Sequence, residues 1–176
     1  MAGHPNKKAE AALSATQLRR MLSYDPGMGI FKWLVRPYVR SKSRVGDVAG
    51  KPTNKGYVTI TTKGHRYLAH RLGWLYMTGE WPKALIDHRD LDRGNNRWSN
   101  LREATKSENM INRGAASNSK TGVKGVNKHS QCNSYCAYIC VNYKRIYLGS
   151  FKTIPEAKEA YDVAAKKYFG EFARAA

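Results

Sequence analysis

The pair Asp87-His88 and two later asparagines, Asn100 and Asn109, carry side chains that together can perform hydrolytic chemistry. Asp87 and Asn109 offer carboxylate and amide oxygens, hard ligands that suit Mg²⁺ or Mn²⁺ with waters completing the shell. His88 can accept a proton from a water molecule near neutral pH. One metal and one general base are what hydrolysis of a phosphodiester bond requires, so the pattern predicts a site of that kind.

Short elements must bring these four residues together, because they lie apart in the chain. The expected elements are, in order, a strand over residues 85–89, a loop over 90–97, a return strand over 98–103 and a helix beginning at the capping box Thr105-Lys-Ser-Glu108. Asn100 would then lie on the return strand, where its side-chain oxygen can hold the His88 imidazole and fix the basic nitrogen. Taken singly, Asp87 and His88 also fit a solvated turn, and the asparagines fit caps.

The charge of the chain indicates a polyanionic partner. The 176 residues include 31 Lys and Arg but only 13 Asp and Glu, which gives a net charge of +18. Between residues 32 and 71 there are ten basic residues and one acid, Asp47. A balance of this kind favours nucleic acid as the partner.

The sequence lacks the marks of a membrane or disulfide-stabilised protein. No apolar run approaches the roughly 20 residues that a membrane span requires, and the N-terminus has no apolar signal segment. The expected location is therefore the cytoplasm. The cysteines at 132, 136 and 140 lack the spacing of a zinc site or a disulfide framework, so free thiols are expected.

Composition predicts two small domains. Residues 1–13 are polar and rich in alanine, and a disordered tail is expected there. Residues 14–113 would form the first domain, with the candidate site and a basic N-terminal extension. Gly114-Ala-Ala-Ser-Asn-Ser119 is typical of a linker, so residues 114–120 are expected to connect it to a second domain over 121–176.

The second domain has two strand-like segments and one long helix-like segment. Ala137, Ile139 and Val141 alternate with more polar positions, as do Ile146 and Leu148 after a turn. The helix begins at the capping box Thr153-Ile-Pro-Glu156 and ends at Gly170. Its apolar stripe can cover one face of the sheet, which leaves the opposite face able to meet a partner.

The stretch from about residue 69 to residue 112 closely resembles the HNH homing endonucleases of bacteriophages. The matching pieces are Ala69-His70-Arg71-Leu72, Asp87-His88, Asn95-Asn96 with Asn100-Leu101-Arg102, and Ser107-Glu108-Asn109. The resemblance implies a ββα-metal fold with His88 as general base, Asn100 as the middle asparagine and Asn109 as the final metal ligand. His70 would support the site or pack on its helix, and Asn96 would tie down the loop.

Residues 121–172 resemble the Apetala or ethylene-response-factor type of DNA-binding domain. The resemblance rests on Thr121-Gly-Val-Lys-Gly-Val126, Tyr135-Cys-Ala-Tyr-Ile139, Lys144-Arg-Ile-Tyr-Leu-Gly149 and Glu156-Ala-Lys-Glu-Ala-Tyr161. It implies a three-stranded sheet that enters the major groove. Its DNA-contacting positions fall on Lys124, Asn127, His129, Tyr138, Cys140, Arg145 and Tyr147. Asn127, Tyr138 and Cys140 replace charged residues of the plant pattern, so the base preference cannot be copied.

The combined prediction is an α+β protein with a ββα-metal nuclease core and a small three-stranded antiparallel sheet packed on one helix. It would cut double-stranded DNA with one Mg²⁺ or Mn²⁺, as a monomer or weak dimer. Phosphate contacts are expected from the basic residues Arg40, Lys42, Arg44, Lys55, Lys63, Arg66 and Arg71. The alternatives are a non-cleaving DNA-binding regulator that retains an HNH fold, and a binder of structured RNA.

Overall fold

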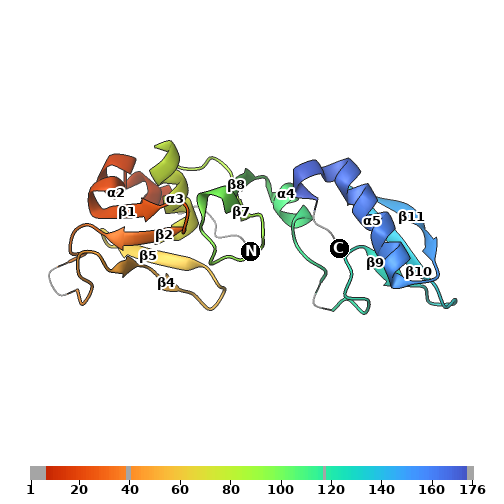
Figure 1. Ribbon diagram of the computed structural model, residues 1–176. Coiled ribbons are helices and arrows are strands. Elements are labelled where there is room, and N and C mark those ends of the chain that lie inside the picture. The colour runs from red at the N-terminus through yellow and green to blue at the C-terminus, as the bar shows by residue number, and fades with distance from the viewer. Residues whose placement is uncertain (1–6, 39–40, 117, 174–176) are drawn as a thin grey trace. The chain divides into compact units, whose positions relative to one another are not determined.

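The structure is a computed structural model that describes residues 7–38, 41–116 and 118–173 (Figure 1). The chain divides into two compact units at the bond between Lys106 and Ser107, and each is described by itself. The sequence pattern places the end of the first domain later, at residue 113, so the predicted linker 114–120 lies inside the second unit.

In its described residues, the first unit combines four helical segments with two three-stranded sheets and one separate hairpin. Its helical segments are α1 (Lys7–Ala11), α2 (Ala15–Met21), α3 (Ala69–Thr78) and the 3-10 turn η1 (Trp98–Asn100). One sheet contains β1 (Leu22–Asp25), β2 (Ile30–Trp33) and β3 (Val48–Ala49), and the other contains β4 (Lys51–Pro52), β5 (Val58–Thr62) and β6 (His65–Leu68). The hairpin pairs β7 (Leu85–His88) with β8 (Leu101–Ala104).

The core of the first unit forms where α2 and α3 pack together with the two sheets (Figure 1). Leu72 and Leu75, which lie on the apolar stripe expected along residues 67–78, are both fully buried on α3. Leu18 on α2 and Ile60 on β5 join the same cluster. The helical periodicity therefore identified the buried face of α3 correctly.

Residues 1–6 of the expected disordered tail, residues 1–13, lie outside the described residues, and the expectation is wrong for residues 7–13. Lys7–Ala11 form helix α1, and Ala9 and Leu13 are fully buried in the core. The Tyr67 hydroxyl donates to the Ala9 carbonyl at 2.9 Å. A helix this short is unstable alone, so contacts distant in sequence hold it, and local composition does not reveal them.

The second unit confirms the predicted sheet on one helix. Its elements are α4 (Lys106–Ile111, which begins one residue before the division), β9 (Val126–Lys128), β10 (Tyr135–Val141), β11 (Lys144–Phe151), α5 (Ile154–Phe169) and η2 (Gly170–Phe172). The antiparallel sheet has the order β11-β10-β9, and α5 packs along it (Figure 1). Ile139 from β10 and Tyr161 and Ala165 from α5 are buried between helix and sheet.

The other expectations from composition can be compared with the same described residues. Cys132, Cys136 and Cys140 are free thiols, as predicted. Among the helices described, none combines the length and the apolar composition that a bilayer crossing requires.

Candidate functional site

The hairpin β7–β8 places the candidate acid and base next to one another in the interior of the first unit. Its register pairs Asp87 with Arg102 and His88 with Leu101. Asp87 and His88 are each only 4% exposed. A carboxylate and an imidazole buried this deeply need specific partners, because desolvation penalises a charged group without one.

Arg102 forms a buried ion pair with Asp87. Its Nε and Nη2 atoms donate to Asp87 Oδ2 at 3.0 and 2.9 Å, and both side chains are buried. The sequence reasoning missed this ion pair. The expected hairpin contained the signal, because an acid and a base directly opposite on antiparallel strands lie within contact distance.

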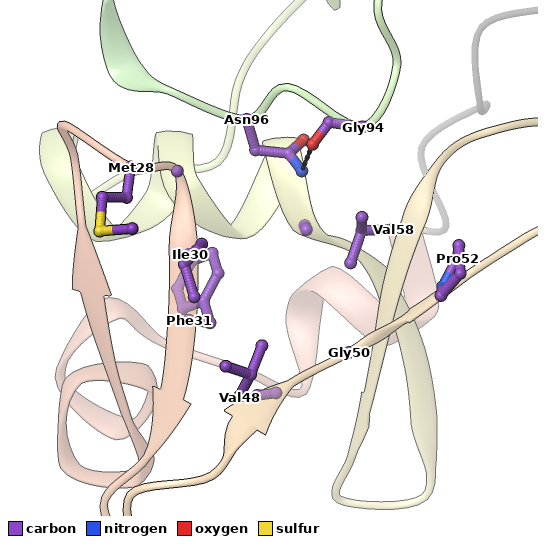
Figure 2. Close-up of a pocket in the computed structure, with 12 residues that line it drawn as sticks. Met28, Ile30, Phe31, Val48, Gly50, Pro52, Val58, Gly94 and Asn96 are labelled. Carbon is purple, nitrogen blue, oxygen red and sulfur yellow. Dashed lines mark hydrogen bonds between the residues drawn. The ribbon is translucent and has the colours of Figure 1, made fainter.

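Asn96 contacts the imidazole of His88. Asn96 Oδ1 lies 3.4 Å from His88 Nε2, and the other end of the amide, Nδ2, donates to the Gly94 carbonyl at 2.9 Å. The second bond fixes the orientation of the amide, as Figure 2 shows for Asn96 and Gly94. Because Oδ1 can only accept, a hydrogen bond between these two atoms assigns the proton of the neutral ring to Nε2 and makes Nδ1 the basic nitrogen.

The expectation that Asn100 holds the imidazole is wrong. Asn100 Nδ2 donates to Asp90 Oδ1 at 2.9 Å and to the Asn95 carbonyl at 2.8 Å, while its Oδ1 accepts from the Asp90 amide at 3.1 Å. Asn100 ends the 3-10 turn η1 where a strand was expected, and its side chain is used to close the loop over residues 90–97. Asn100 therefore shapes the loop, and Asn96 contacts His88.

Two further rings pack around His88. His70 on α3 meets it edge to face at a centroid distance of 5.0 Å, and Tyr57 lies 5.4 Å from His70 and 6.2 Å from His88. His70 is 2% exposed, and its Nδ1 atom has no hydrogen-bond partner among the described residues. This agrees with the expectation that His70 supports the site by packing.

Burial lowers the pKa of both histidines. For His88, desolvation is the largest influence, and the Asn96 hydrogen bond and the nearby Asp90, Asp87 and Asp92 oppose it. For His70, desolvation together with the charges of His88 and Arg71 holds the pKa well below 6.5. Both imidazoles are therefore neutral at neutral pH, the form that a general base needs.

The first unit is expected to lose stability as the pH falls below 6.5, partly because of His70. In the folded state His70 stays neutral, whereas in the unfolded chain it binds a proton near its ordinary pKa of 6.5. The contribution of His70 to the free energy of unfolding is complete above pH 6.5. It is lost as the pH falls toward the folded pKa, by up to about 1.4 kcal/mol per pH unit.

His70→Phe should reduce the pH dependence of the unfolding free energy, because phenylalanine retains a ring but binds no proton. All four tryptophans lie in the first unit, so tryptophan fluorescence during urea unfolding at pH 7.5, 6.5 and 5.5 measures the effect. Equal pH slopes for the wild type and His70→Phe would exclude a buried neutral His70.

The predicted phosphate-contacting residues of the first unit have two different environments. Most lie exposed in loops or on β6, and these are Lys42, Arg44, Lys55, Lys63 and Arg66. Arg40 lies outside the described residues. Arg71 is 3% exposed and its guanidinium bonds to Glu10 and to the carbonyls of Pro82 and Ala84. The predicted DNA contact of Arg71 is therefore wrong, because its charge is used to fix α1 to α3.

In the second unit, three predicted DNA-contacting side chains form one cluster on the sheet. The Arg145 guanidinium lies 3.7 Å from the ring centroid of Tyr138, and Tyr147 lies 5.3 Å from Tyr138. Arg145 and Tyr147 are exposed, and Tyr138 is half-buried. Asn127 and Cys140 are exposed and His129 is half-buried.

Lys124 has an internal role in the second unit. Its ammonium donates to the carbonyls of Met110 at 3.3 Å and Arg113 at 2.9 Å, and also to the carbonyl of Ile111. It therefore satisfies carbonyls at the C-terminal end of α4. A DNA contact by Lys124 would have to compete with these three bonds.

A half-open pocket of about 370 Å³ lies beside the Asn96 loop. Figure 2 shows Asn96 and Gly94 at one end of it and Val48 at the other, with Ile30, Phe31 and Val58 along its length. Its lining is largely apolar and comes from β2, β3, β4 and β5, the turn before β2 and the start of α3. Asn96 thus has two neighbours, this pocket on one side and His88 on the other.

The two predicted metal ligands carry oxygen donors of the kind that hard divalent cations bind. Asp87 has its carboxylate at the end of β7 in the first unit, and Asn109, half-buried, has its amide oxygen on α4 in the second unit. No cluster of three or more His, Cys, Asp or Glu side chains able to hold a metal occurs in the described part of the chain. A pair of oxygen ligands suits Mg²⁺, which commonly retains several waters.

Comparisons with known proteins agree with this chemistry. Residues 67–111 match the family described as HNH endonuclease. The chain is 34% identical over 119 residues to a protein of Acanthamoeba polyphaga mimivirus named as an uncharacterized HNH endonuclease. This similarity covers 67% of the chain and 61% of the relative, so the chain spans about three-fifths of the relative's length. The findings support an HNH endonuclease domain at residues 67–111, and a bacteriophage source stays a prediction.

Proposed function

We propose that this protein is a metal-dependent, site-selective DNA endonuclease of the homing type. The observation that carries the proposal is the buried, neutral His88 beside Asp87 at the end of β7, within the segment that matches the HNH family. The net charge of +18 supports a nucleic-acid substrate. The ββα-metal core that this function requires would consist of β7, β8 and α4.

The proposed chemistry assigns one task to each side chain. His88 Nδ1 takes a proton from the attacking water, while the Asn96 amide oxygen keeps the proton of the neutral ring on Nε2. The loop closed by Asn100 holds Asn96 in place. Arg102 fixes the Asp87 carboxylate through Oδ2. The exposed Lys42, Arg44, Lys55, Lys63 and Arg66 provide phosphate contacts.

Asp87 and Asn109 are the proposed ligands of one Mg²⁺ or Mn²⁺. When bound, the metal would offset the charge that develops on the phosphate and the leaving 3′ oxygen. The support for Asn109 is its place in the HNH sequence pattern. Asp87 would share its carboxylate between the metal and Arg102, since Oδ2 already accepts two bonds from the guanidinium.

The second unit is proposed to be an Apetala-type DNA-binding domain that chooses the site. Its three-stranded sheet packs against α5 and carries the cluster of half-buried Tyr138 with the exposed Arg145 and Tyr147. Strands that enter the major groove are an established means of reading base edges. An arginine can bond to both O6 and N7 of guanine there.

Cleavage of supercoiled plasmid DNA carrying the sequence that flanks the gene tests the proposed function. Nicked or linear product should form with Mg²⁺ and disappear when EDTA is added. Undiminished cleavage in EDTA would exclude the metal. Tight duplex binding without cleavage under either Mg²⁺ or Mn²⁺ would favour the non-cleaving regulator, and preferential binding of structured RNA in competition would exclude DNA as the substrate.

Arg145 should determine which DNA sequence is bound, whereas the basic residues Arg40, Lys42 and Arg44 should determine the affinity for any DNA. Arg145→Ala is expected to lose roughly 1–3 kcal/mol of binding chiefly on the target duplex, because a guanine contact distinguishes bases. A triple alanine variant of Arg40, Lys42 and Arg44 should weaken target and scrambled duplexes alike. Each lost phosphate contact would reduce the log–log salt slope by about one.

Fluorescence anisotropy across a salt series measures both variants. The proposed roles are wrong if Arg145→Ala weakens binding to both duplexes equally and the triple variant loses affinity only for the target duplex.

A further inference from the structure

The turn between β1 and β2 lies directly against the loop that holds Asn96. The hydroxyl of Tyr24 donates to the Asn96 carbonyl at 2.6 Å, across a separation of 72 residues. One turn residue, Pro26, accepts from the Trp98 amide at 2.9 Å. Both segments of the loop that flank Arg97 are therefore bonded to the N-terminal hairpin.

Gly29 shows how closely the two backbones approach. It has a φ of +71°, and a Cβ added there would lie 2.4 Å from the Arg97 nitrogen and from the Asn96 carbonyl carbon. No side chain fits at that distance, and L residues rarely adopt this φ. Glycine at this position allows the turn to pack directly against the loop backbone.

Tyr24 is itself held firmly. It is 7% exposed, its ring stacks on Phe31 at 4.6 Å, and Gly73 on α3 leaves only 3.3 Å between an added Cβ and the Tyr24 hydroxyl. Burial, with a smaller contribution from Asp25, raises the pKa of Tyr24 to about 12. The hydroxyl is therefore a permanent donor at any pH at which a nuclease would work.

We infer that Tyr24 is a positioning residue for His88. Its bond to the Asn96 carbonyl fixes the loop backbone, and that backbone keeps Asn96 Oδ1 at His88 Nε2, 3.4 Å away. The inference rests on the proposed function, in which His88 is the general base. It places an essential part of the site outside residues 67–111, the segment that matches the HNH family.

Tyr24→Phe tests the inference, because it removes one oxygen and retains the ring. Tyr67→Phe is the matched control. Tyr67 is equally buried in the same unit, and its hydroxyl also donates to a backbone carbonyl, that of Ala9, at 2.9 Å. Both variants of the full chain should lower the melting temperature by similar amounts, since each loses one buried hydrogen bond.

Only Tyr24→Phe should slow the chemical step. We expect kcat on saturating plasmid to fall about tenfold with KM unchanged, because small displacements of catalytic groups are costly. Tyr67→Phe should stay within about twofold of the wild type. Equal kcat losses in the two variants, or a Tyr24→Phe effect confined to KM, would overturn the positioning role.

A second measurement separates this inference from the proposed function. The ¹⁵N chemical shifts of the His88 ring at a fixed pH of 7.5 report which nitrogen carries the proton, whether or not the protein cleaves DNA. Tyr24→Phe should move both shifts toward a mixture of tautomers, whereas Tyr67→Phe should leave them unchanged. Unchanged shifts in Tyr24→Phe overturn the inference, even where wild-type cleavage upholds the proposed function.

Discussion

Replacing His88 with alanine should reduce the rate of DNA cleavage by about 10²–10⁴-fold, the usual cost of losing a general base. The affinity for duplex DNA should change little, because the imidazole is 4% exposed and acts in the chemical step. Single-turnover cleavage and anisotropy binding in EDTA measure the two quantities separately. Both assays use the full chain.

His65→Ala provides the matched control for this variant. His65 lies on β6 in the same unit, half-buried and without a proposed role in the chemistry. The His65→Ala variant should cleave DNA at close to the wild-type rate. Tryptophan fluorescence confirms that both variants are folded. Wild-type turnover by a folded His88→Ala variant would remove His88 from the role of base.

The sequence predicts the parts of the site that follow from local patterns. The 3.6-residue period located the buried face of α3, and the alternation of apolar residues located β10 and β11 with the helix that covers them. The motif from Asp87 onward placed the acid and the imidazole at the end of a strand, where the structure has them. Each of these patterns depends only on neighbours within a few residues.

The contacts that sequence could not predict all join segments distant in the chain. Ala9 is buried on α1, which Tyr67 and Arg71 bind through hydrogen bonds to Ala9 and Glu10. Asn96 rather than Asn100 contacts His88. The 3-10 turn η1 replaces the first three residues of the expected strand, and the Asn100 side chain bonds within the loop instead. These outcomes depend on tertiary packing, which overrides local preference.

The contacts that the sequence did not predict include those that orient the proposed catalytic side chains. The acid and base lie on one hairpin, but the groups that orient them come from the loop after β7, from β8 and from the N-terminal hairpin. Catalytic side chains need support of this kind, because their own backbone segment cannot fix a rotamer to within the required tolerance. The segment that matches the HNH family thus depends on residues outside it.

Arg102→Met should destabilise the first unit by about 3–5 kcal/mol, the usual cost of removing one partner of a buried ion pair. Arg102 and Asp87 have side chains only 7% and 4% exposed and meet at 2.9 Å. Methionine retains much of the volume but no charge, so the Asp87 carboxylate remains desolvated. Urea unfolding followed by tryptophan fluorescence measures the loss, since all four tryptophans lie in this unit.

Two further variants make the result specific to the ion pair. Arg66→Met removes an exposed arginine from β6 and should change the unfolding free energy by less than about 0.5 kcal/mol. The double variant Asp87→Leu/Arg102→Met should lose less stability than Arg102→Met alone, because it also removes the buried carboxylate charge. If Arg102→Met costs no more than Arg66→Met, Asp87 is not held by Arg102 in solution. The proposed sharing of its carboxylate between guanidinium and metal would then be wrong.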